Sequence, residues 1–313
     1  MGIKYLNRVL RTQCGDAITR RHLWSLKNKK IVIDTYIYLY RFKGEDGLIE
    51  NFYHMISLFK HYKITPIFVF DGKPPPEKQQ EIECRIKSKI EAEERYNKLK
   101  EKLDKISDIE SKQEVINEMI DEKKKFIRIT KSDIENVKKL FDAYGVVYVV
   151  ADGEADELCY KLIKKKIVYG CLSEDMDMFV YGCDRVFRYF SLINATFIEY
   201  NQKKILEKLK LTQNEFREIC VLAGTDYNEG CNIYKALSLF EKFKKSKCSG
   251  DFYKWLKKEN IIDDYQSLIS CYLMFDLPYD NNYDFKKIQV VDKKIDRISL
   301  RKILIDDGFI FIN

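Results

Sequence analysis

The sequence contains few of the residues that several common kinds of site require. Only three histidines occur among its 313 residues, and no H-E-x-x-H pattern is present. None of the nine cysteines belongs to a C-x-x-C pair, and their odd number and scattered spacing favour reduced thiols over a disulfide framework. Catalysis by a histidine base and a zinc site built from histidine or cysteine are therefore disfavoured.

Long apolar runs are also missing. No stretch approaches the roughly 18 apolar residues that a membrane-spanning helix needs. Arg8, Arg11 and Asp16 interrupt the N-terminus before any run typical of a signal peptide. The chain is 45% hydrophobic, enough for a sizeable core, and its net charge is +7. This charge alone fits ordinary solubility as well as it fits binding to a polyanion.

Seven carboxylates stand out because most of them lie beside apolar, strand-like runs. They are Asp34, Asp71, Glu154, Asp156, Asp175, Asp177 and Asp226. A carboxylate at the end of an apolar strand is costly to bury without a cation or a hydrogen-bond donor, and several that converge repel one another unless a divalent metal neutralises them. An acidic pocket in a basic chain suggests a metal-dependent enzyme that acts on a polyanion.

The first 76 residues show an alternation of strand and helix. Strands are predicted at 30–34 and 64–71, with two helices between them. This order and spacing predict a parallel β-α-β unit. Asp34 and Asp71 fall at the carboxyl ends of the two strands, where α/β sheets place their sites.

A charged insertion follows the break at Gly72–Pro76. Residues 77 to about 125 are dominated by Lys, Glu, Arg and Gln, with thin apolar spacing. The pattern fits a solvated charged helix or a weakly packed helical hairpin. It also fits an insertion that projects over an active site and meets substrate.

Regular structure resumes after this insertion. Residues 132–144 predict an amphipathic helix with Ser132 as its N-cap. Residues 146–150 predict a buried strand and residues 167–172 the next strand. From residue 203 onward the pattern is helical almost throughout.

The later carboxylates include two pairs that are two residues apart. Glu154 and Asp156 do not share a face of a regular helix, but they converge if they straddle a helix start, where negative charge is favourable. Asp175 and Asp177 follow a strand, and in extended chain this spacing places both on one side. Asp226 follows a small-residue turn after an apolar helix.

Oxygen ligands without nitrogen or sulfur suit Mg²⁺ or Mn²⁺. Two such ions about 3.5–4 Å apart are a common device for phosphodiester cleavage. For any single aspartate, a helix cap or a surface charge is the simpler interpretation. The pattern alone leaves both interpretations open.

Six segments in one order carry a resemblance over roughly residues 1–245. They are Met1-Gly2-Ile3, Ile31-Val32-Ile33-Asp34, Val69-Phe70-Asp71-Gly72-Lys73-Pro74-Pro75, Gly153-Glu154-Ala155-Asp156-Glu157, Ser173-Glu174-Asp175-Met176-Asp177 and Ala223-Gly224-Thr225-Asp226-Tyr227. In order and spacing the chain resembles the XPG/flap-endonuclease family of structure-specific 5′ nucleases.

The resemblance implies a PIN-like 5′-nuclease fold, an α/β architecture with a mostly parallel central sheet and helices on both faces. It implies a single nuclease domain over residues 1–313. The regions of that domain would be an N-terminal nuclease region (1–76), a helical arch (77–131), an internal nuclease region (132–280) with a helix–two-turn–helix-like segment near 219–245, and a C-terminal extension (281–313).

The resemblance also implies roles for individual residues. All seven carboxylates would line a two-metal site for Mg²⁺, with Mn²⁺ as the alternative ion. Lys78 and Arg85 match catalytic arch cations; seven residues apart on a helix, they would share one face and reach one phosphate. Tyr40 would stack on the base beside the scissile phosphate, which is worth about 1–3 kcal/mol. The remaining DNA-binding positions would be Gly2, Lys131 and Lys235.

Three departures from the family pattern matter. Asp156 stands where the family usually has glutamate, and the shorter side chain would act through water. Cys231-Asn232-Ile233 aligns with a Gly-Ile-Gly hairpin, which puts a monovalent-cation site and the grip on duplex DNA in doubt. No sliding-clamp box (Gln-x-x-aliphatic-x-x-aromatic-aromatic) is recognisable, so recruitment by the replication clamp is not expected.

We therefore expect a 5′ flap endonuclease and 5′-3′ exonuclease that recognises bent duplex and unpaired bases rather than base edges. Its partner would be DNA with a 5′ flap, nick or gap, in replication, repair or recombination. We expect an intracellular monomer, in the nucleus or the cytoplasm. The alternatives are a recombination or junction nuclease of the same family and a weak or inactive member that binds junctions structurally.

Overall fold

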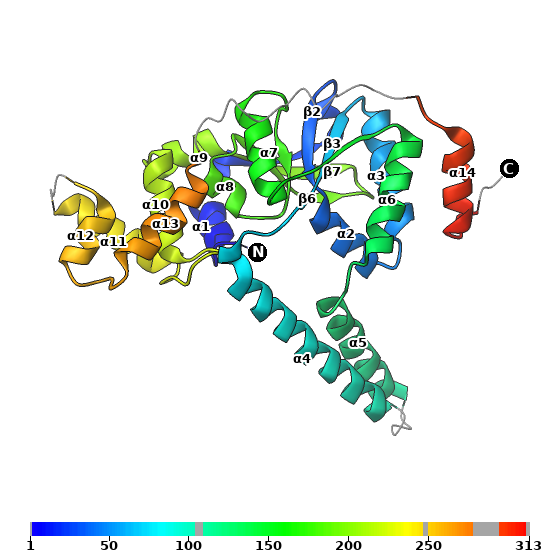
Figure 1. The fold of residues 1–313 in the computed structure, drawn as a ribbon, viewed down its shortest axis with the longest axis horizontal. Coiled ribbons are helices and arrows are strands. Elements are labelled where there is room, and N and C mark those ends of the chain that lie inside the picture. The colour runs from blue at the N-terminus through cyan, green and yellow to red at the C-terminus, as the bar shows by residue number, and fades with distance from the viewer. Residues whose placement is uncertain (1, 104–108, 247–249, 278–293, 311–313) are drawn as a thin grey trace. The chain divides into compact units, whose positions relative to one another are not determined.

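The computed structural model describes residues 2–103, 109–246, 250–277 and 294–310 (Figure 1). By their contacts the residues divide into two compact units. The sheet unit comprises Met1–Asp34, Ile56–Lys73 and Val147–Val291. The hairpin unit comprises Thr35–Met55, Pro74–Val146 and Asp292–Asn313. No helix in these described ranges is long and apolar enough to cross a membrane.

A seven-stranded sheet in the order β1-β7-β6-β5-β2-β3-β4 forms the centre of the sheet unit. The strands are β1 (Ile18–His22), β2 (Lys30–Asp34), β3 (Thr65–Phe70), β4 (Val147–Val150), β5 (Cys171–Leu172), β6 (Arg185–Ser191) and β7 (Thr196–Asn201). All neighbours from β6 to β4 are parallel, whereas β7 is antiparallel to both β1 and β6. The prediction of a mostly parallel sheet is confirmed, and the two N-terminal strand predictions correspond to β2 and β3.

Helices surround this sheet. Those of the sheet unit are α1 (Leu6–Gln13), α7 (Ala155–Lys164), α8 (Asp177–Tyr181), α9 (Gln202–Leu209), α10 (Gln213–Ala223), α11 (Ile233–Lys245), α12 (Phe252–Lys258) and α13 (Tyr265–Phe275), and α10 to α13 gather at one end of the unit (Figure 1). β2 and β3 are buried along nearly their whole length, so residues that point to opposite faces are equally hidden. Val32 and Val69 belong to one continuous apolar core that also takes in Leu158 of α7 and Phe179 of α8.

The hairpin unit is helical. Its elements are α2 (Thr35–Gly44), the short 3₁₀ turn η3 (Pro76–Lys78), α4 (Gln79–Leu103), α5 (Ile109–Lys125), α6 (Lys131–Tyr144) and α14 (Arg297–Asp306), and α3 (Leu48–His61) contributes to both units. α4 and α5 lie side by side (Figure 1). Arg95 pairs with Glu122 at 3.1 Å, and the rings of Tyr96 and Phe126 meet edge to face at 5.4 Å. Of the two structures that the charged pattern of residues 77–125 left open, a charged helix and a helical hairpin, the structure shows the hairpin.

A small aromatic core supports the base of this hairpin unit. The ring of Phe52 contacts the rings of Phe42 and Phe141, with centroids 4.9 and 5.5 Å apart. The sequence did not predict α14, which begins where the backbone amide of Asp296 donates to the carbonyl oxygen of Ala143 at 2.8 Å. Much of the predicted extension 281–313 lies outside the described residues.

The structure corrects three local predictions. Thr130, not Ser132, caps α6, because Thr130 and Asp133 form a reciprocal capping box. β4 is an edge strand and only partly buried, although its apolar sequence predicts a buried one. β5 has regular strand geometry over two residues and is shorter than the predicted 167–172.

Candidate active site

Four of the predicted carboxylates lie at or after the carboxyl ends of strands that are neighbours in the sheet. Asp34 is the last residue of β2, and Asp71 directly follows β3. Glu154 follows β4 and Asp175 follows β5. In the sheet these strands are neighbours, in the order β5-β2-β3-β4, and they are parallel. Four adjacent carboxyl ends therefore each deliver an acidic side chain to the same edge.

A short hydrogen-bond network fixes the acids at the ends of β2 and β5. The hydroxyl of Ser173 donates to Oδ2 of Asp34 at 3.2 Å and accepts the amide of Asp175 at 3.1 Å. Oδ1 of Asp175 accepts the amide of Asp177 at 3.0 Å. The buried carboxylates of Asp34 and Asp175 are thus held by donors, and Asp177 joins the network through its backbone amide. The role of Ser173 was missed, although its place two residues before Asp175 permits such a turn.

The predicted extended geometry of Asp175 and Asp177 is wrong. Met176 between them has helical torsions (φ −79°, ψ −16°), and Asp177 begins α8. The two side chains are nevertheless close, since both face Gly2. A Cβ atom at Gly2 would come within 2.6 Å of Oδ1 of Asp175 and closer still to Oδ1 of Asp177. With φ of +71°, this position suits glycine on both counts.

The start of α7 gathers a second group of acids. Oδ1 of Asp71 accepts a hydrogen bond from the amide of Ala155 at 2.8 Å, so Asp71, which directly follows β3, caps the N-terminus of α7. Glu154 is the N-cap residue of α7 but makes no side-chain cap bond, and Asp156 lies in the first turn. The prediction that Glu154 and Asp156 straddle a helix start is confirmed. The positive end of α7 favours all three negative charges.

Tyr227 connects this group to the turn that carries Asp226. α10 ends at Ala223, and Gly224 turns the chain with φ of +104°. The hydroxyl of Tyr227 then donates to Oε2 of Glu154. Tyr227 belongs to the Ala223–Tyr227 segment that carries the family resemblance, but no local pattern predicts this contact. Because Asp226 directly precedes Tyr227, this bond holds the turn that carries Asp226 next to Glu154.

The acids impose a negative potential on the groups packed below them. Burial raises the pKa of the Tyr181 hydroxyl well above its usual value, and the charges of Asp156, Glu154 and Asp177 raise it further. Burial likewise raises the pKa of the Cys220 thiol, with Asp177 adding to the effect. The eight described cysteines are all free thiols, as their spacing predicts, and Cys248 lies outside the described residues.

The described residues hold no group of three or more acidic, cysteine or histidine side chains close enough to share one metal ion. The donor set is nevertheless one of oxygen atoms at an edge with negative potential. Mg²⁺ commonly takes only one or two protein carboxylates and completes its shell with water and substrate phosphates. The residues present therefore fit Mg²⁺ without a preformed cage.

The predicted arch residues all belong to the hairpin unit, whereas the seven carboxylates all belong to the sheet unit. Lys78 lies in η3 and Arg85 in α4, so the two do not occupy one continuous α-helix as their spacing predicts. Arg85 pairs with Glu81. Tyr40 on α2 is 39% exposed, and Nζ of Lys89 lies 4.6 Å from its ring centre. Lys131 is the exposed first residue of α6.

The α10–α11 turn accommodates the departure from glycine. A Cβ atom at Gly230 would collide with the backbone of Ala223 and Gly224, so a glycine is required directly before the aligned Cys231. Asn232 adopts φ of 74° and caps α11, with its side chain accepting the amides of Tyr234 and Lys235 at 3.1 Å each. The side chain of Lys235 is exposed.

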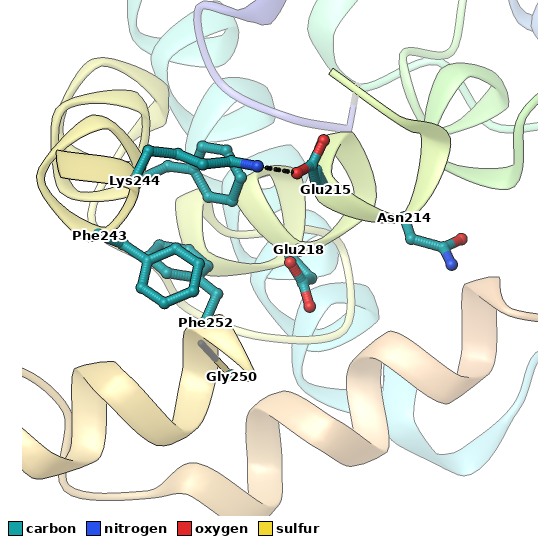
Figure 2. A pocket seen from close by; sticks show the side chains of 8 residues that line it. Asn214, Glu215, Glu218, Phe243, Lys244, Gly250 and Phe252 are labelled. Carbon is teal, nitrogen blue, oxygen red and sulfur yellow. Dashed lines mark hydrogen bonds and ion pairs between the residues drawn. The ribbon is translucent and has the colours of Figure 1, made fainter. Parts of the chain in front are cut away.

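A cavity of about 350 Å³ lies apart from these acids, between α10, α11 and α12 (Figure 2). It is lined by Asn214, Glu215, Glu218, Phe240, Phe243, Lys244, Gly250 and Phe252, none of which is a predicted site residue. Lys244 points across it to pair with Glu215 (Figure 2). Burial, with Asp251 and Glu215 adding to it, raises the pKa of Glu218 to about 7.

Comparison with known sequences gives matches to two family models. The XPG N-terminal domain matches residues 1–92 and the XPG I-region matches residues 145–226. Flap endonuclease 1 of Encephalitozoon cuniculi is 33% identical over 265 residues, which cover 78% of this chain and 73% of that protein. A probable RAD2-like endonuclease 369L of Invertebrate iridescent virus 6 is 28% identical and covers 83% of this chain and 75% of that protein.

Solved structures share the fold. Flap endonuclease-1 from Methanococcus jannaschii has a TM-score of 0.61 and 26% identity, with 94% of this chain and 92% of that chain covered. The catalytic core of Rad2 in complex with DNA substrate has a TM-score of 0.65 and 21% identity, with 96% and 94% covered. The Holliday junction-resolving enzyme GEN1, with product DNA, Mg²⁺ and Mn²⁺, has a TM-score of 0.65 and 17% identity, with 95% and 71% covered.

Proposed function

Because the chain belongs to the XPG/flap-endonuclease family, we propose that it is a structure-specific 5′ nuclease that cuts DNA at junctions between single strand and duplex. The observation that carries the proposal is the row of acids at four neighbouring strand ends, which are Asp175, Asp34, Asp71 and Glu154 in spatial order. Asp156, Asp177 and Asp226 complete the predicted set.

We assign all seven carboxylates to a two-metal site for Mg²⁺, with Mn²⁺ as the alternative. The oxygen donors support this assignment, as does the GEN1 structure that holds both ions. When bound, two ions would supply a water nucleophile at neutral pH and stabilise the charge that develops on the phosphate. Asp156, one methylene shorter than the glutamate usual in the family, would take part through water.

The chain's own residues would set the geometry of this site. Ser173 holds Asp34 and Asp175 in one orientation, and Tyr227 holds Glu154. Gly2 leaves space beside Asp175 and Asp177 that any side chain would fill. Such fixed partners matter because ligands that lose their supporting hydrogen bonds commonly lose metal affinity or activity by about 10–100-fold.

The hairpin unit would handle the unpaired strand within a single nuclease domain. We propose that residues 77–131 form the arch that a free 5′ end enters. Tyr40 would stack on the base beside the cut, and Lys78 and Arg85 would neutralise the phosphate there as catalytic cations. Lys131 would add a further phosphate contact at the rear of the arch.

A second candidate is a family member that binds DNA junctions without cutting them. The observation that favours it is the altered α10–α11 turn, in which the side chain of Asn232 occupies amides at the start of α11. Against it, every predicted acidic position is filled and both predicted arch cations are present. We therefore place the cutting function first.

Cleavage of a 5′-labelled double-flap DNA with Mg²⁺ tests the proposal. The same DNA with its 5′ end blocked by a bulky complex is the comparison. We expect cutting of the free flap near the junction and loss of cutting on the blocked flap. Equal cutting of both would keep the nuclease and remove threading through residues 77–131. Binding without cutting of either would favour the structural role.

A further inference from the structure

Two exposed tyrosines from distant parts of the sheet unit lie side by side. Tyr5 precedes α1 and is 49% exposed, and Tyr234 lies in the first turn of α11 and is 47% exposed. Their ring centres are 6.1 Å apart, with the rings tilted by 39°. The two half-exposed rings present adjacent, mutually tilted aromatic faces, which we call the Tyr5–Tyr234 platform.

Positive charge surrounds this platform. Nζ of Lys4 lies 5.5 Å from the ring centre of Tyr5, and Lys235 directly follows Tyr234. Arg8 is an additional exposed cation on α1, and the acidic residues nearest in sequence to Tyr234 are Glu229 and Glu241. Aromatic faces flanked by lysines are suited to a ligand that combines a planar ring with a phosphate.

The backbone on both sides of the platform is unusual. Tyr5 has φ of 66° and Asn232, two residues before Tyr234, has φ of 74°. A bulky residue such as tyrosine is uncommon in the left-handed region, and such conformations persist where the surrounding structure enforces them, often at functional sites. This independent observation indicates that the contact between Tyr5 and Tyr234 is not accidental.

The platform is also connected to the acidic edge through both of its elements. Gly2, against Asp175 and Asp177, is three residues from Tyr5, a distance of about 10 Å at full extension. The turn that leads into α11 carries Asp226. The backbone amides of Tyr234 and Lys235 donate to the side chain of Asn232. A phosphate at this end of α11 would therefore contact side chains and not these amides.

We infer that the Tyr5–Tyr234 platform is a second stacking site for nucleic acid, which holds an unpaired base next to the acidic edge while Lys4 and Lys235 contact the flanking phosphates. The inference rests on the proposed function for the DNA itself. The tilt between the rings leaves no parallel slot between them, so the base lies on an exposed ring face. This site is distinct from Tyr40, which belongs to the other unit.

Fluorescence anisotropy in EDTA tests the inference without any cleavage. The probes are a labelled duplex with a single-stranded extension and a fully paired duplex of the same length. In the full chain, replacing both residues (Tyr5→Ala and Tyr234→Ala) should weaken binding of the extended DNA by roughly tenfold to a hundredfold, the size of one lost stacking contact. Binding of the paired duplex should change less than threefold.

Two control variants separate stacking from other effects. The double phenylalanine variant (Tyr5→Phe and Tyr234→Phe) keeps both ring faces and should bind like wild type. Trp24→Ala removes another exposed aromatic side chain of the sheet unit, 66% exposed, and should change neither affinity. Unaltered thermal unfolding of each variant shows that the fold is intact.

The other outcomes overturn the inference. Wild-type affinity of the double alanine variant for the extended DNA removes the platform from DNA binding. An equal loss on both DNAs assigns the tyrosines to duplex backbone and not to an unpaired base. If the wild-type chain binds neither DNA, the proposed function fails together with the inference. If the wild-type chain cleaves the flap DNA and the double alanine variant binds the extended DNA as the wild type does, only the inference fails.

Discussion

The sheet unit and the hairpin unit differ most in how they hold their charges. In the sheet unit, Asp34 and Asp175 are each 6% exposed, and their carboxylates accept from the Ser173 hydroxyl and from the backbone amide of Asp177, respectively. In the hairpin unit, the charges of α4 and α5 pair at the surface, and the side chain of Arg95 is 51% exposed. Exposed pairs contribute little to stability. Packing thus fixes the acids in place, whereas the hairpin charges are free to exchange partners with a ligand.

The largest expected effect comes from breaking the packing under the acids. Phe179 of α8 is fully buried and lies on the ring of Tyr200, with centroids 5.5 Å apart. Phe179→Ala should lower the free energy of unfolding by about 3–5 kcal/mol, through lost burial and the cavity left behind. Denaturant unfolding measures it, and a loss below about 1 kcal/mol would contradict a tightly packed base for Asp177.

The next effect concerns a single hydrogen bond at the site. Tyr227→Phe removes the donor to Glu154 and keeps the ring against Phe275, whose centroid is 5.4 Å away. We expect Mn²⁺ affinity, measured by calorimetry without DNA, to fall by about 10–100-fold while thermal unfolding stays unchanged. Wild-type Mn²⁺ affinity would show that Tyr227 does not orient Glu154 toward a metal.

A smaller effect tests Glu218, a half-buried acid that lines the cavity between α10, α11 and α12. Burial raises the pKa of Glu218 from 4.5 to about 7, so the folded chain holds this proton more tightly than the unfolded chain does. Stability due to this group is therefore complete below about pH 4.5 and is lost as the pH rises to about 7. Glu218→Gln should stabilise the protein by about 1 kcal/mol at pH 8, a value reduced for partial exposure, and by nothing at pH 4. Equal effects at both pH values would refute the assigned pKa.

The smallest effect belongs to the hairpin. Arg95→Ala breaks the surface pair with Glu122. Because such pairs are screened by solvent, we expect no measurable change in the free energy of unfolding. A large loss would mean that α4 and α5 depend on this ion pair, and the contrast between the two units would disappear.

Sequence reasoning succeeded where local pattern decides the structure. Apolar runs located β2 and β3 and placed Asp34 and Asp71 at their ends. Sequence reasoning failed where pairing between residues far apart in the sequence decides the structure. β1 carries exposed arginines and becomes a strand only by pairing with β7, almost 180 residues later. Likewise, Tyr169 and Gly170, just before β5, form backbone hydrogen bonds to β2 but do not adopt regular strand geometry.

Sequence patterns placed the acids at strand and helix ends, whereas the residues that support them were missed; the role of the acids as metal ligands stays a prediction. Each acid could be found because it lies at or near a readable end of a strand or helix. Ser173 and Tyr227 act through contacts that span about 139 and 73 residues of sequence, which no local pattern reports. Capping of α6 was readable, because Thr130 and Asp133 have the spacing of a capping box.

Replacing Asp177 with asparagine tests the central claim most directly. The full-length Asp177→Asn chain and the wild type are compared on the same double-flap DNA, for cleavage with Mg²⁺ and for binding in EDTA. The account predicts that the cleavage rate falls by at least about a hundredfold while the dissociation constant for DNA changes less than about threefold. The reason is that this acid acts in the chemical step and not in DNA binding. Cleavage at the wild-type rate would show that the acidic edge is not the active site.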